Sequence, residues 1–310
     1  MSAAFQVVEP GLLTTFQDLG RLGAIAGGVP PGGPMDRFAH RAANLLVGNP
    51  VSDATLECTI TGPTLISEVE CTVAVTGSGL VPVIDGAERP AWTALELSPG
   101  RRLSFATRGR RGRAYLAVSG GFEGDRWLGS RSTYLLAARG GMQGRALKSG
   151  DVLEASARRT PPLERRRALE AVPDYSTRTL AVMAGPHARR LDGRSKESLF
   201  GEAFTVSVDS NRMGARLDGP ALIAKGEDVL TFGLVAGAVQ LPRSGQPILL
   251  LADHQTAGGY PVIATVVSAA MPLAGQLVPG DEVRFELVTA ARARAMRQAM
   301  NEALASLSAP

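Results

Sequence analysis

Four short stretches of this sequence combine carboxylates, amides and arginines with glycines: TTFQDLGRLG, GGVPPGGPMD, DSNRMGARLDGP and ADHQTAGGYP. Carboxylates act as general bases, and arginines bind carboxylate or phosphoryl groups. Glycines let the backbone approach a ligand where any Cβ would intrude. The candidate catalytic residues are therefore Asp18, Arg21 and Asp253. The candidate substrate-binding residues are Gln17, Gly33, Met35, Asp36, Asn211, Arg212, Gln255, Thr256, Gly258, Gly259 and Tyr260.

Each stretch also has an ordinary structural interpretation. Asp18 and Arg21 could form a structural salt bridge, and the Pro/Gly loop at 27–36 could be a stiff connector into a helix. Residues 209–212 could form an Asx turn, and Asp253 could only cap the strand before it. Four such stretches, two in each half of the chain, favour one shared site over four unrelated loops.

The fourth stretch follows the apolar run ILLL and carries much of the predicted chemistry. We expect it to form one wall of the ligand site, opposite QDLGRLG from the other half of the chain. Asp253 would be a charged anchor or general base, and Gly258 and Gly259 would let the backbone come near the ligand. Tyr260 and Pro261 would then re-enter a β-barrel.

The framework that positions these loops is predicted to be mainly β. Short apolar or alternating runs recur between turn residues, which is typical of strands closed into barrels or sandwiches. The 36 glycines and 20 prolines of the chain fit many tight turns. The runs are CTVAVTG, RRLSFAT, RAYLAVSGG, TLAVMAGP, AVQLP, PILLLAD, PVIATVVS and DEVRFELV.

Helices are predicted at two main places. GGPMDRFAHRAANLLVGNP has Pro34 near a helix start and the breakers 48–50 as its stop. TAARARAMRQAMNEALASL predicts a C-terminal amphipathic helix, because four apolar residues share one side of it. These residues are Met296, Met300, Ala303 and Leu307.

Two domains of ordinary size fit a chain of 310 residues. The charged, proline-rich stretch RRTPPLERRRALEAVPDYSTR separates them, so we expect β-barrel domains at 1–165 and 166–310. The halves also echo each other: GPTLI at Gly62 resembles GPALI at Gly219, and LSPGRRLSF resembles LVPGDEVRF. These echoes predict two copies of one β-unit, with Gly62 aligned on Gly219.

The composition argues against several classes of function. The 33 basic and 29 acidic residues give a net charge of +4, and the arginine clusters lack interleaved aromatics, so nucleic-acid binding is not expected. The N-terminus has no signal-peptide pattern, and the uncharged stretch 255–280 is interrupted by Gly, Pro, Gln and Ser. We therefore expect a cytoplasmic protein without a membrane span. Cys58 and Cys71 are expected to be free thiols, although a hairpin could bring them together.

Several catalytic motifs are missing from the sequence. It has no Gly-x-x-x-x-Gly-Lys-Ser/Thr loop, no Gly-x-Gly-x-x-Gly after a strand and no Gly-x-Ser-x-Gly elbow. The three histidines share no metal-ligand spacing, so no metal site is expected. No lysine lies in a Met-Lys-Met hairpin of the kind that carries biotin. We therefore expect no covalently bound cofactor, and any ATP or biotin would come from elsewhere.

Seven motifs together resemble one known family. They are PGLLTTFQDLGR, GVPPGGPMD, GNP, LECTITGPTL, GSRST, DSNRMGARLDGP and ADHQTAGGYPVIA, in order from about residue 7 to about residue 288. The family is called allophanate hydrolase subunit 2, the 5-oxoprolinase C subunit or the biotin-dependent carboxyltransferase family. The resemblance implies two cyclophilin-like β-barrel domains, a sister subunit of the same fold (the B type) and a third partner subunit (the A type). Such assemblies use ATP to open 5-oxoproline to glutamate. The resemblance therefore implies that the complex containing this chain uses ATP.

The resemblance leaves two other functions open. The related domain of urea carboxylase transfers a carboxyl group from carboxybiotin to urea, which would make this chain a carboxyltransferase with its biotin on another protein. A regulatory pair of the family acts on a kinase, which would make it a binding protein for a sister subunit or a kinase. Carboxylates and amides crowded into glycine loops favour a small anionic or ureido substrate, and hence the enzyme subunit.

Two residues depart from the usual family pattern. Gly32 stands where the loop commonly has a serine, and His254 stands where an arginine commonly follows Asp253. Losing a hydroxyl and replacing a fixed cation by a titratable group would retune the ligand and leave the fold unchanged. Hydrolysis of allophanate itself is not expected, because the activated serine and its lysine partner have no signature in this sequence.

Overall fold

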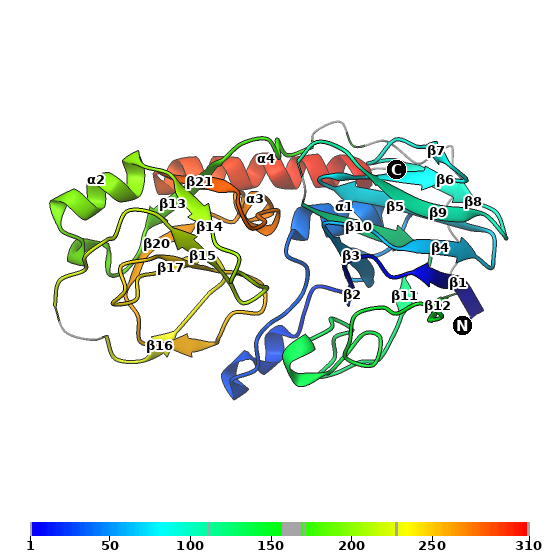
Figure 1. Ribbon diagram of the computed structural model, residues 1–310, viewed down its shortest axis with the longest axis horizontal. Coiled ribbons are helices and arrows are strands. Elements are labelled where there is room, and N and C mark those ends of the chain that lie inside the picture. Colours follow the sequence, from blue (N-terminus) through cyan, green and yellow to red (C-terminus); the bar gives the residue numbers. More distant parts are fainter. Residues whose placement is uncertain (1, 111, 157–168, 170–171, 227–228, 309–310) are drawn as a thin grey trace. The chain divides into compact units, whose positions relative to one another are not determined.

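The computed structural model describes residues 2–110, 112–156, 169, 172–226 and 229–308. The chain divides into two compact units, which are described separately (Figure 1). Unit 1 comprises Met1–Arg21, Gly32–Val172 and Asn301–Pro310, and unit 2 comprises Leu22–Pro31 and Pro173–Met300. The domain boundary predicted between residues 165 and 166 lies outside the described residues.

Unit 1 contains a seven-stranded and a five-stranded sheet. The larger sheet has the order β11-β12-β1-β4-β9-β6-β7 and the smaller one the order β2-β3-β10-β5-β8. The strands are β1 (Ser2–Glu9), β2 (Leu13–Gln17), β3 (Thr55–Thr59), β4 (Thr64–Ser67), β5 (Cys71–Gly77), β6 (Leu80–Ile84), β7 (Ala87–Glu88), β8 (Ala94–Leu97), β9 (Arg102–Thr107), β10 (Arg113–Val118), β11 (Phe122–Glu123) and β12 (Val152–Ala155).

One hydrophobic core joins the two sheets of unit 1. Phe5 on β1 of the larger sheet and Phe16 on β2 of the smaller sheet both contact Phe122, with ring centroids 6.0 and 5.9 Å apart. All three rings belong to one buried cluster with residues from both sheets. The inward-facing halves of the alternating strands therefore make a sandwich-like core, as the sequence pattern requires.

Helix α1 (Arg37–Leu46) covers the other face of the smaller sheet, where its alanines and Leu46 pack against Tyr115 of β10. Asp36 caps the helix by accepting a hydrogen bond from the N–H of Ala39 at 2.9 Å. Gly48, with φ of +76°, follows the last turn. The predicted start and stop of this helix are confirmed. The short 3-10 helix η2 spans Leu135–Ala137.

Unit 2 is built on a closed barrel with the strand order β13-β20-β17-β18-β15-β14-β21. Its strands are β13 (Thr179–Ala184), β14 (Phe204–Val206), β15 (Gly214–Asp218), β17 (Ala238–Gln240), β18 (Ile248–Leu250), β20 (Val262–Val266) and β21 (Glu282–Leu287). A small sheet pairs β16 (Phe232–Gly233) with β19 (Ala257–Gly258). The helical segments that begin in unit 2 are η1 (Leu22–Gly27), η4 (Ala188–Arg190), α2 (Gly193–Gly201), α3 (Met271–Gly275) and α4 (Ala290–Ser308).

The predicted mainly β fold, with a few short helices and a C-terminal helix, is confirmed. The barrel is closed in unit 2, whereas the strands of unit 1 form two sheets around a shared core. On α4, the four side chains of the predicted apolar stripe are partly buried, whereas most of the side chains around them on the helix are exposed. Both cysteines are free thiols, as expected. In the described part of the chain, the helices are all too short or too polar to span a bilayer.

One of the two predicted echoes is a true structural repeat. The segments 98–101 and 278–281 each form a tight turn, in which the last residue donates its N–H to the carbonyl of the first at 3.2 and 3.1 Å. The third residues, Gly100 and Gly280, have φ of +80° and +87°, as a type II turn requires. Each turn leads directly into a strand, β9 in unit 1 and β21 in unit 2.

The alignment of Gly62 with Gly219 is wrong. The two turn glycines donate their N–H groups to Ser67 and Val206, the last residues of β4 and β14, so β14 is the counterpart of β4. Gly62 precedes β4, whereas Gly219 follows β15, which pairs with β14. The Gly-Pro pair at 219 is a place where the chain leaves the sheet, because proline has no N–H to donate to a ladder.

The repeated turn predicts equal effects of Gly100→Ala and Gly280→Ala. A Cβ at either position would meet no atom within 4 Å, so the loss arises from the left-handed backbone alone and should be about 1–2 kcal/mol. Urea denaturation measures it. Gly201→Ala is the control, because Gly201 ends α2 with an ordinary φ and open space around it. Turn variants as stable as this control would contradict the repeat.

Candidate functional site

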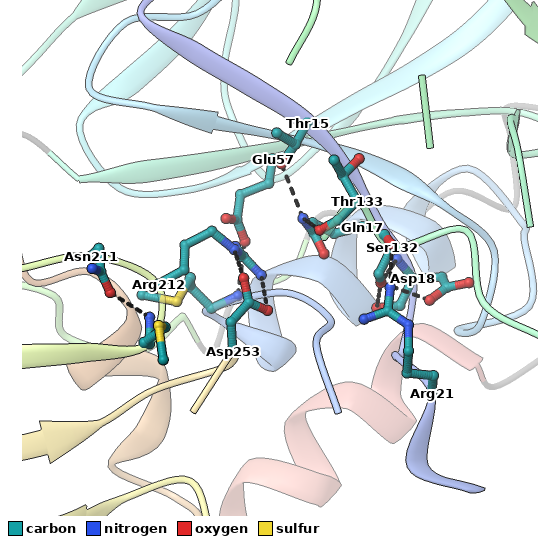
Figure 2. A network of polar contacts seen from close by, with 12 residues as sticks. Thr15, Gln17, Asp18, Arg21, Glu57, Ser132, Thr133, Asn211, Arg212 and Asp253 are labelled. Atoms are coloured by element: carbon teal, nitrogen blue, oxygen red, sulfur yellow. Dashed lines mark hydrogen bonds and ion pairs between the residues drawn. The ribbon is translucent and has the colours of Figure 1, made fainter. Parts of the chain in front are cut away.

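The carboxylate of Asp18, directly after β2, binds the segment 130–132 of the GSRST motif, of which Figure 2 labels Ser132. It accepts hydrogen bonds from Ser130 Oγ at 2.5 Å, from the N–H of Arg131 at 2.6 Å and from Ser132 Oγ at 2.8 Å. It also accepts one from the N–H of Gly20 at 2.9 Å. With its carboxylate used in this way, Asp18 is an organiser of the loop.

The guanidinium of Arg21 is held at the same loop. Arg21 is only 2% exposed, and its Nη2 donates to the carbonyl of Ser132. Its guanidinium carbon lies 5.0 Å from the ring centroid of Trp127 and 5.9 Å from that of Tyr134. The two rings are parallel within 7°. Cation–π contacts and a backbone acceptor therefore compensate for the burial of this charge.

The space around position 32 explains why this chain has a glycine there in place of the serine of the usual family pattern. Gly32 has φ of +66°, and a Cβ there would lie 2.6 Å from Nη1 of Arg21. Gly33, with φ of +93°, is also closely approached, since its Cβ would be 3.2 Å from the carbonyl oxygen of Asp18. The glycines of this loop make room for the Asp18–Arg21 segment.

Gln17 lies beside this cluster and is fully buried. Its Nε2 donates to Thr15 Oγ1 at 3.0 Å and reaches the carbonyl of Thr133 at 3.5 Å. Within the described residues, Gln17 Oε1 and Thr133 Oγ1 are buried without a hydrogen-bond partner. Such atoms call for a water or a ligand group.

Met35 and Asp36 belong to a second buried network in unit 1. Glu57 Oε2 accepts hydrogen bonds from the N–H of Met35 at 2.8 Å and from Tyr115 Oη at 2.7 Å. Tyr115 Oη in turn accepts the N–H of Asp36 at 2.7 Å. Burial, and then the charge of Glu57, raise the pKa of Tyr115 well above its usual value, so the phenol stays a donor.

Arg212 and Asp253 form a buried ion pair in unit 2. Nε of Arg212 donates to Oδ2 of Asp253 at 2.8 Å, and Nη2 donates to Oδ1 at 3.3 Å. Their side chains are 9% and 6% exposed. The N–H of Asp253 also donates to the carbonyl of Arg212 at 2.9 Å. This two-point geometry fixes the guanidinium in one plane.

Asn211 holds the turn that precedes Arg212. Its Oδ1 accepts the N–H of Met213 at 2.8 Å, and its own N–H donates to the carbonyl of Gly214 at 3.1 Å. The Asx-turn interpretation is correct for Asn211. This turn sets where Arg212 leaves the chain, just before β15.

The residues after Asp253 contact other segments of unit 2. Gln255 Nε2 donates to Gln240 Oε1 at 3.2 Å, and the carbonyl of Thr256 accepts the N–H of Leu234 at 2.9 Å. A Cβ at Gly258 would lie 2.9 Å from Leu234 Cδ1. The strand β19 therefore needs glycine for packing, whatever it binds.

Tyr260 does not re-enter the barrel. It is 47% exposed and lines, with Gly259 and Pro261, a pocket of about 300 Å³ that also contains Arg190 and Arg243. The chain rejoins the barrel at Pro261, whose carbonyl accepts the N–H of Leu241 at 2.9 Å, and β20 begins at the next residue. The expectation is therefore correct for Pro261 and wrong for Tyr260.

The histidines are structural. Burial lowers the pKa of His40 to about 4, so its ring is neutral at pH 7 and contacts Thr55 Oγ1 at 2.9 Å. Burial also lowers the pKa of His187, whose Nδ1 accepts the N–H of Val262 at 3.1 Å. Nδ1 of His254 contacts the carbonyl of Gln255 at 2.8 Å. Within the described residues, no three His, Cys, Asp or Glu side chains are arranged to hold a metal ion.

The structure thus brings the predicted residues into separate clusters, each inside one unit. Gln17, Asp18 and Arg21 share the 130–133 loop, and Arg212 pairs with Asp253. The facing of the two halves remains a prediction. Sequence reasoning missed the partners of these residues, although two of the motifs, LECTITGPTL and GSRST, contained several of them. The missed residues are Glu57, Tyr115, Trp127, Ser130, Ser132, Thr133 and Tyr134.

Gly32→Ser is expected to destabilise the protein more than Gly28→Ser. Both glycines have positive φ, but a Cβ on Gly28 would meet no atom within 4 Å. Backbone strain of roughly 1–2 kcal/mol is common to both variants. Any additional loss of stability in Gly32→Ser therefore measures the displacement of Arg21. Urea denaturation gives the stabilities, and fluorescence of Trp127 reports the movement of the guanidinium. Equal losses would show that position 32 does not restrain Arg21.

Asp253→Asn is expected to lower stability by about 3–5 kcal/mol, because it leaves the Arg212 charge buried without its anion. Glu88→Gln, which removes the exposed partner of Arg108, is the control and should lower it by less than about 1 kcal/mol. Replacing the pair together, as Asp253→Leu with Arg212→Met, should recover much of the loss. If Asp253→Asn instead keeps full stability but loses turnover in the assembled complex, Asp253 is a base and not a support for Arg212.

Comparison with known proteins places the chain in a family. Residues 27–287 match a family model described as "Carboxyltransferase domain, subdomain A and B". The chain is 35% identical to the 5-oxoprolinase C subunit of Escherichia coli over 306 residues, which are 97% of each protein. It is 32% identical to urea amidolyase of Saccharomyces cerevisiae over 98% of its own length, but it spans only 18% of that protein.

Solved structures are also similar to this chain. The crystal structure of K. lactis urea amidolyase matches with a TM-score of 0.89 at 31% identity, covering 98% of this chain and 20% of that one. The crystal structure of TTHA0988 matches with a TM-score of 0.81 at 35% identity, covering 92% of this chain and 55% of that one. The chain therefore belongs to the carboxyltransferase-domain family that includes the 5-oxoprolinase C subunit and part of urea amidolyase.

Proposed function

We propose that this chain is a subunit of a multi-subunit, ATP-dependent 5-oxoprolinase, which converts 5-oxoproline, ATP and water into glutamate, ADP and phosphate. One observation carries the proposal: the match to the 5-oxoprolinase C subunit of Escherichia coli extends over 97% of both proteins. A second relative with the same name, from Haemophilus influenzae, is 32% identical and is covered over 91% of its length. Because both relatives are named as parts of an enzyme, partner chains are expected here too.

The proposed reaction requires anionic groups to be bound, and a rigidly held arginine can bind them. The lactam of 5-oxoproline is a poor electrophile because of amide resonance, and transfer of a phosphoryl group from ATP to its oxygen, with release of ADP, would activate it for attack by water. Cleavage of the C–N bond would then give the free amine and an acyl phosphate, and a second water would hydrolyse the acyl phosphate to glutamate and phosphate. The substrate carries a carboxylate and the activated species a phosphoryl group, and both are ligands of a fixed guanidinium. In unit 2, Asp253 holds Arg212 in such a fixed plane. Arg212 is the proposed anion-binding residue, and Asp253 is its positioning residue.

The cofactors and partners follow from the same proposal. The sequence has no phosphate-binding loop, so ATP would be bound with the help of the B-type sister subunit or the A-type partner. The site would then be complete only in the assembled complex, in the cytoplasm. Gln17 Oε1, a buried acceptor without a partner among the described residues, would suit the N–H of a lactam or ureido group.

Carboxyl transfer is the second candidate. It is favoured by the description of the family model and by the match to urea amidolyase over 98% of this chain. In that reaction, the same donors would stabilise the negative charge that develops on the ureido oxygen of biotin carried by another protein. Regulation of a kinase or sister subunit is a third candidate, in which the cluster would bind no substrate.

Reconstitution tests the proposed function. The chain alone should release no glutamate from 5-oxoproline, whereas the chain with its A-type and B-type partners should release glutamate and ADP in equal amounts. Arg212→Lys, which keeps the charge but loses the two-point geometry, should slow turnover in the complex roughly a hundredfold. Transfer of labelled carboxyl from a carboxybiotin carrier to urea, without glutamate release, would establish the second candidate instead. Inactivity in both assays would leave the regulatory function.

A further inference from the structure

We infer that unit 2 carries a docking surface for an acidic segment, with apolar side chains, of a partner subunit. The surface consists of two pockets. The α2 pocket, of about 360 Å³, is lined by residues that include Arg189, Lys196, Phe200 and Leu287. The α4 pocket, of about 290 Å³, is lined by residues that include Met183, Ala290, Arg294 and Arg297. The inference rests on the proposed function only in requiring that partner subunits exist.

The two pockets are neighbours on the barrel. The last two residues of β13, Met183 and Ala184, line the α4 pocket and the α2 pocket respectively. On the next strand, β20, Thr265 lines the first and Ile263 the second. At the end of β21, Leu287 lines the α2 pocket, and Ala290 at the start of α4 lines the α4 pocket. The chain from β21 into α4 therefore contributes to both pockets.

Each pocket has an exposed apolar side chain in its lining. Met183 is 39% exposed and Leu287 is 49% exposed. Phe200 on α2 is partly buried and lines the same surface as Leu287. Large apolar side chains gathered at concave sites, and rimmed by polar ones, are typical of protein interaction surfaces.

The rim of this surface is positively charged. Arg189 and Lys196 line one pocket, and Arg294 and Arg297, one turn apart on α4, line the other. No carboxylate is among the described residues that line either pocket. Across the part of the chain that the structure describes, none of these four cations takes part in a salt bridge. A rim of this charge favours an acidic partner.

The occupant is a protein segment. Two neighbouring pockets suit two side chains of one peptide. Their exposed apolar side chains do not favour a nucleic-acid backbone, which would need aromatic stacking or a continuous basic track. The charge of the rim selects Asp and Glu in the partner, and the exposed apolar side chains select Leu, Met or an aromatic residue.

The test is binding of the A-type and B-type partners to the full-length chain, measured as Kd. Two double variants reverse the rim: Arg189→Glu with Lys196→Glu, and Arg294→Glu with Arg297→Glu. The control is Arg216→Glu with Arg292→Glu, which changes the charge by the same amount at exposed residues that line neither pocket. For one of the two partners, each rim variant should bind at least tenfold more weakly than wild type, and the control should bind within twofold. Circular dichroism melting checks that all variants are folded.

Two further results complete the test. The wild-type Kd should weaken as salt is raised, because the contact is between charges, and Met183→Ser should weaken it without changing its salt dependence. The inference is overturned if the wild type binds neither partner, if the rim variants bind like the control, or if the wild-type Kd does not change with salt. Glutamate release by the reconstituted complex judges the proposed function separately, since it can proceed whichever surface the partners use.

Discussion

The carboxylate of Asp18 is the constraint on which the polar part of unit 1 depends. It binds residues up to 114 positions away in sequence, and without it the hydroxyl of Ser130 and the backbone N–H of Arg131 would lose the acceptor that holds them. That segment supplies the carbonyl that receives Arg21. The aromatic pair beside it shields the cation from water. A carboxylate with four donors thus allows a guanidinium to be buried nearby, and the loop glycines give it space.

In unit 2, a buried arginine is stabilised instead by a direct ion pair. Arg212 and Asp253 lie 41 residues apart and meet in a two-point ion pair that is nearly dry. Removing two charges from water is unfavourable, and good geometry recovers the loss without adding much stability. Such a pair is therefore better explained by the need to fix a guanidinium in one orientation than by folding. In both units, a rigid cation is the product of the local architecture.

The sequence allowed the framework to be predicted better than the contacts. Strand runs such as CTVAVTG, and a helix that starts near Pro34 and stops before the breakers 48–50, could be predicted because alternation and helix-end residues are local signals. The partners of Asp18 and Arg212 could not, because pairing across dozens of residues depends on how the sheets close. Glu57 and Tyr115 looked like ordinary strand residues, since nothing in a strand shows which of its polar side chains face inward. The Gly-Pro echo misled because a dipeptide that suits a turn occurs equally at either end of a strand.

The pairing of β13 with β21 bears on how the protein is made. This parallel pair joins Leu180 to Phe285, more than a hundred residues apart, and it closes the barrel of unit 2. Folding of unit 1 also depends on a late part of the chain, because Leu307 packs against the buried cluster around α1. On the ribosome, neither unit has its last contacts until residues near 285 and 307 have emerged. Long-range closure of this kind is slow. The nascent chain must therefore keep two unfinished cores soluble at once, and chaperones have their longest access during that interval.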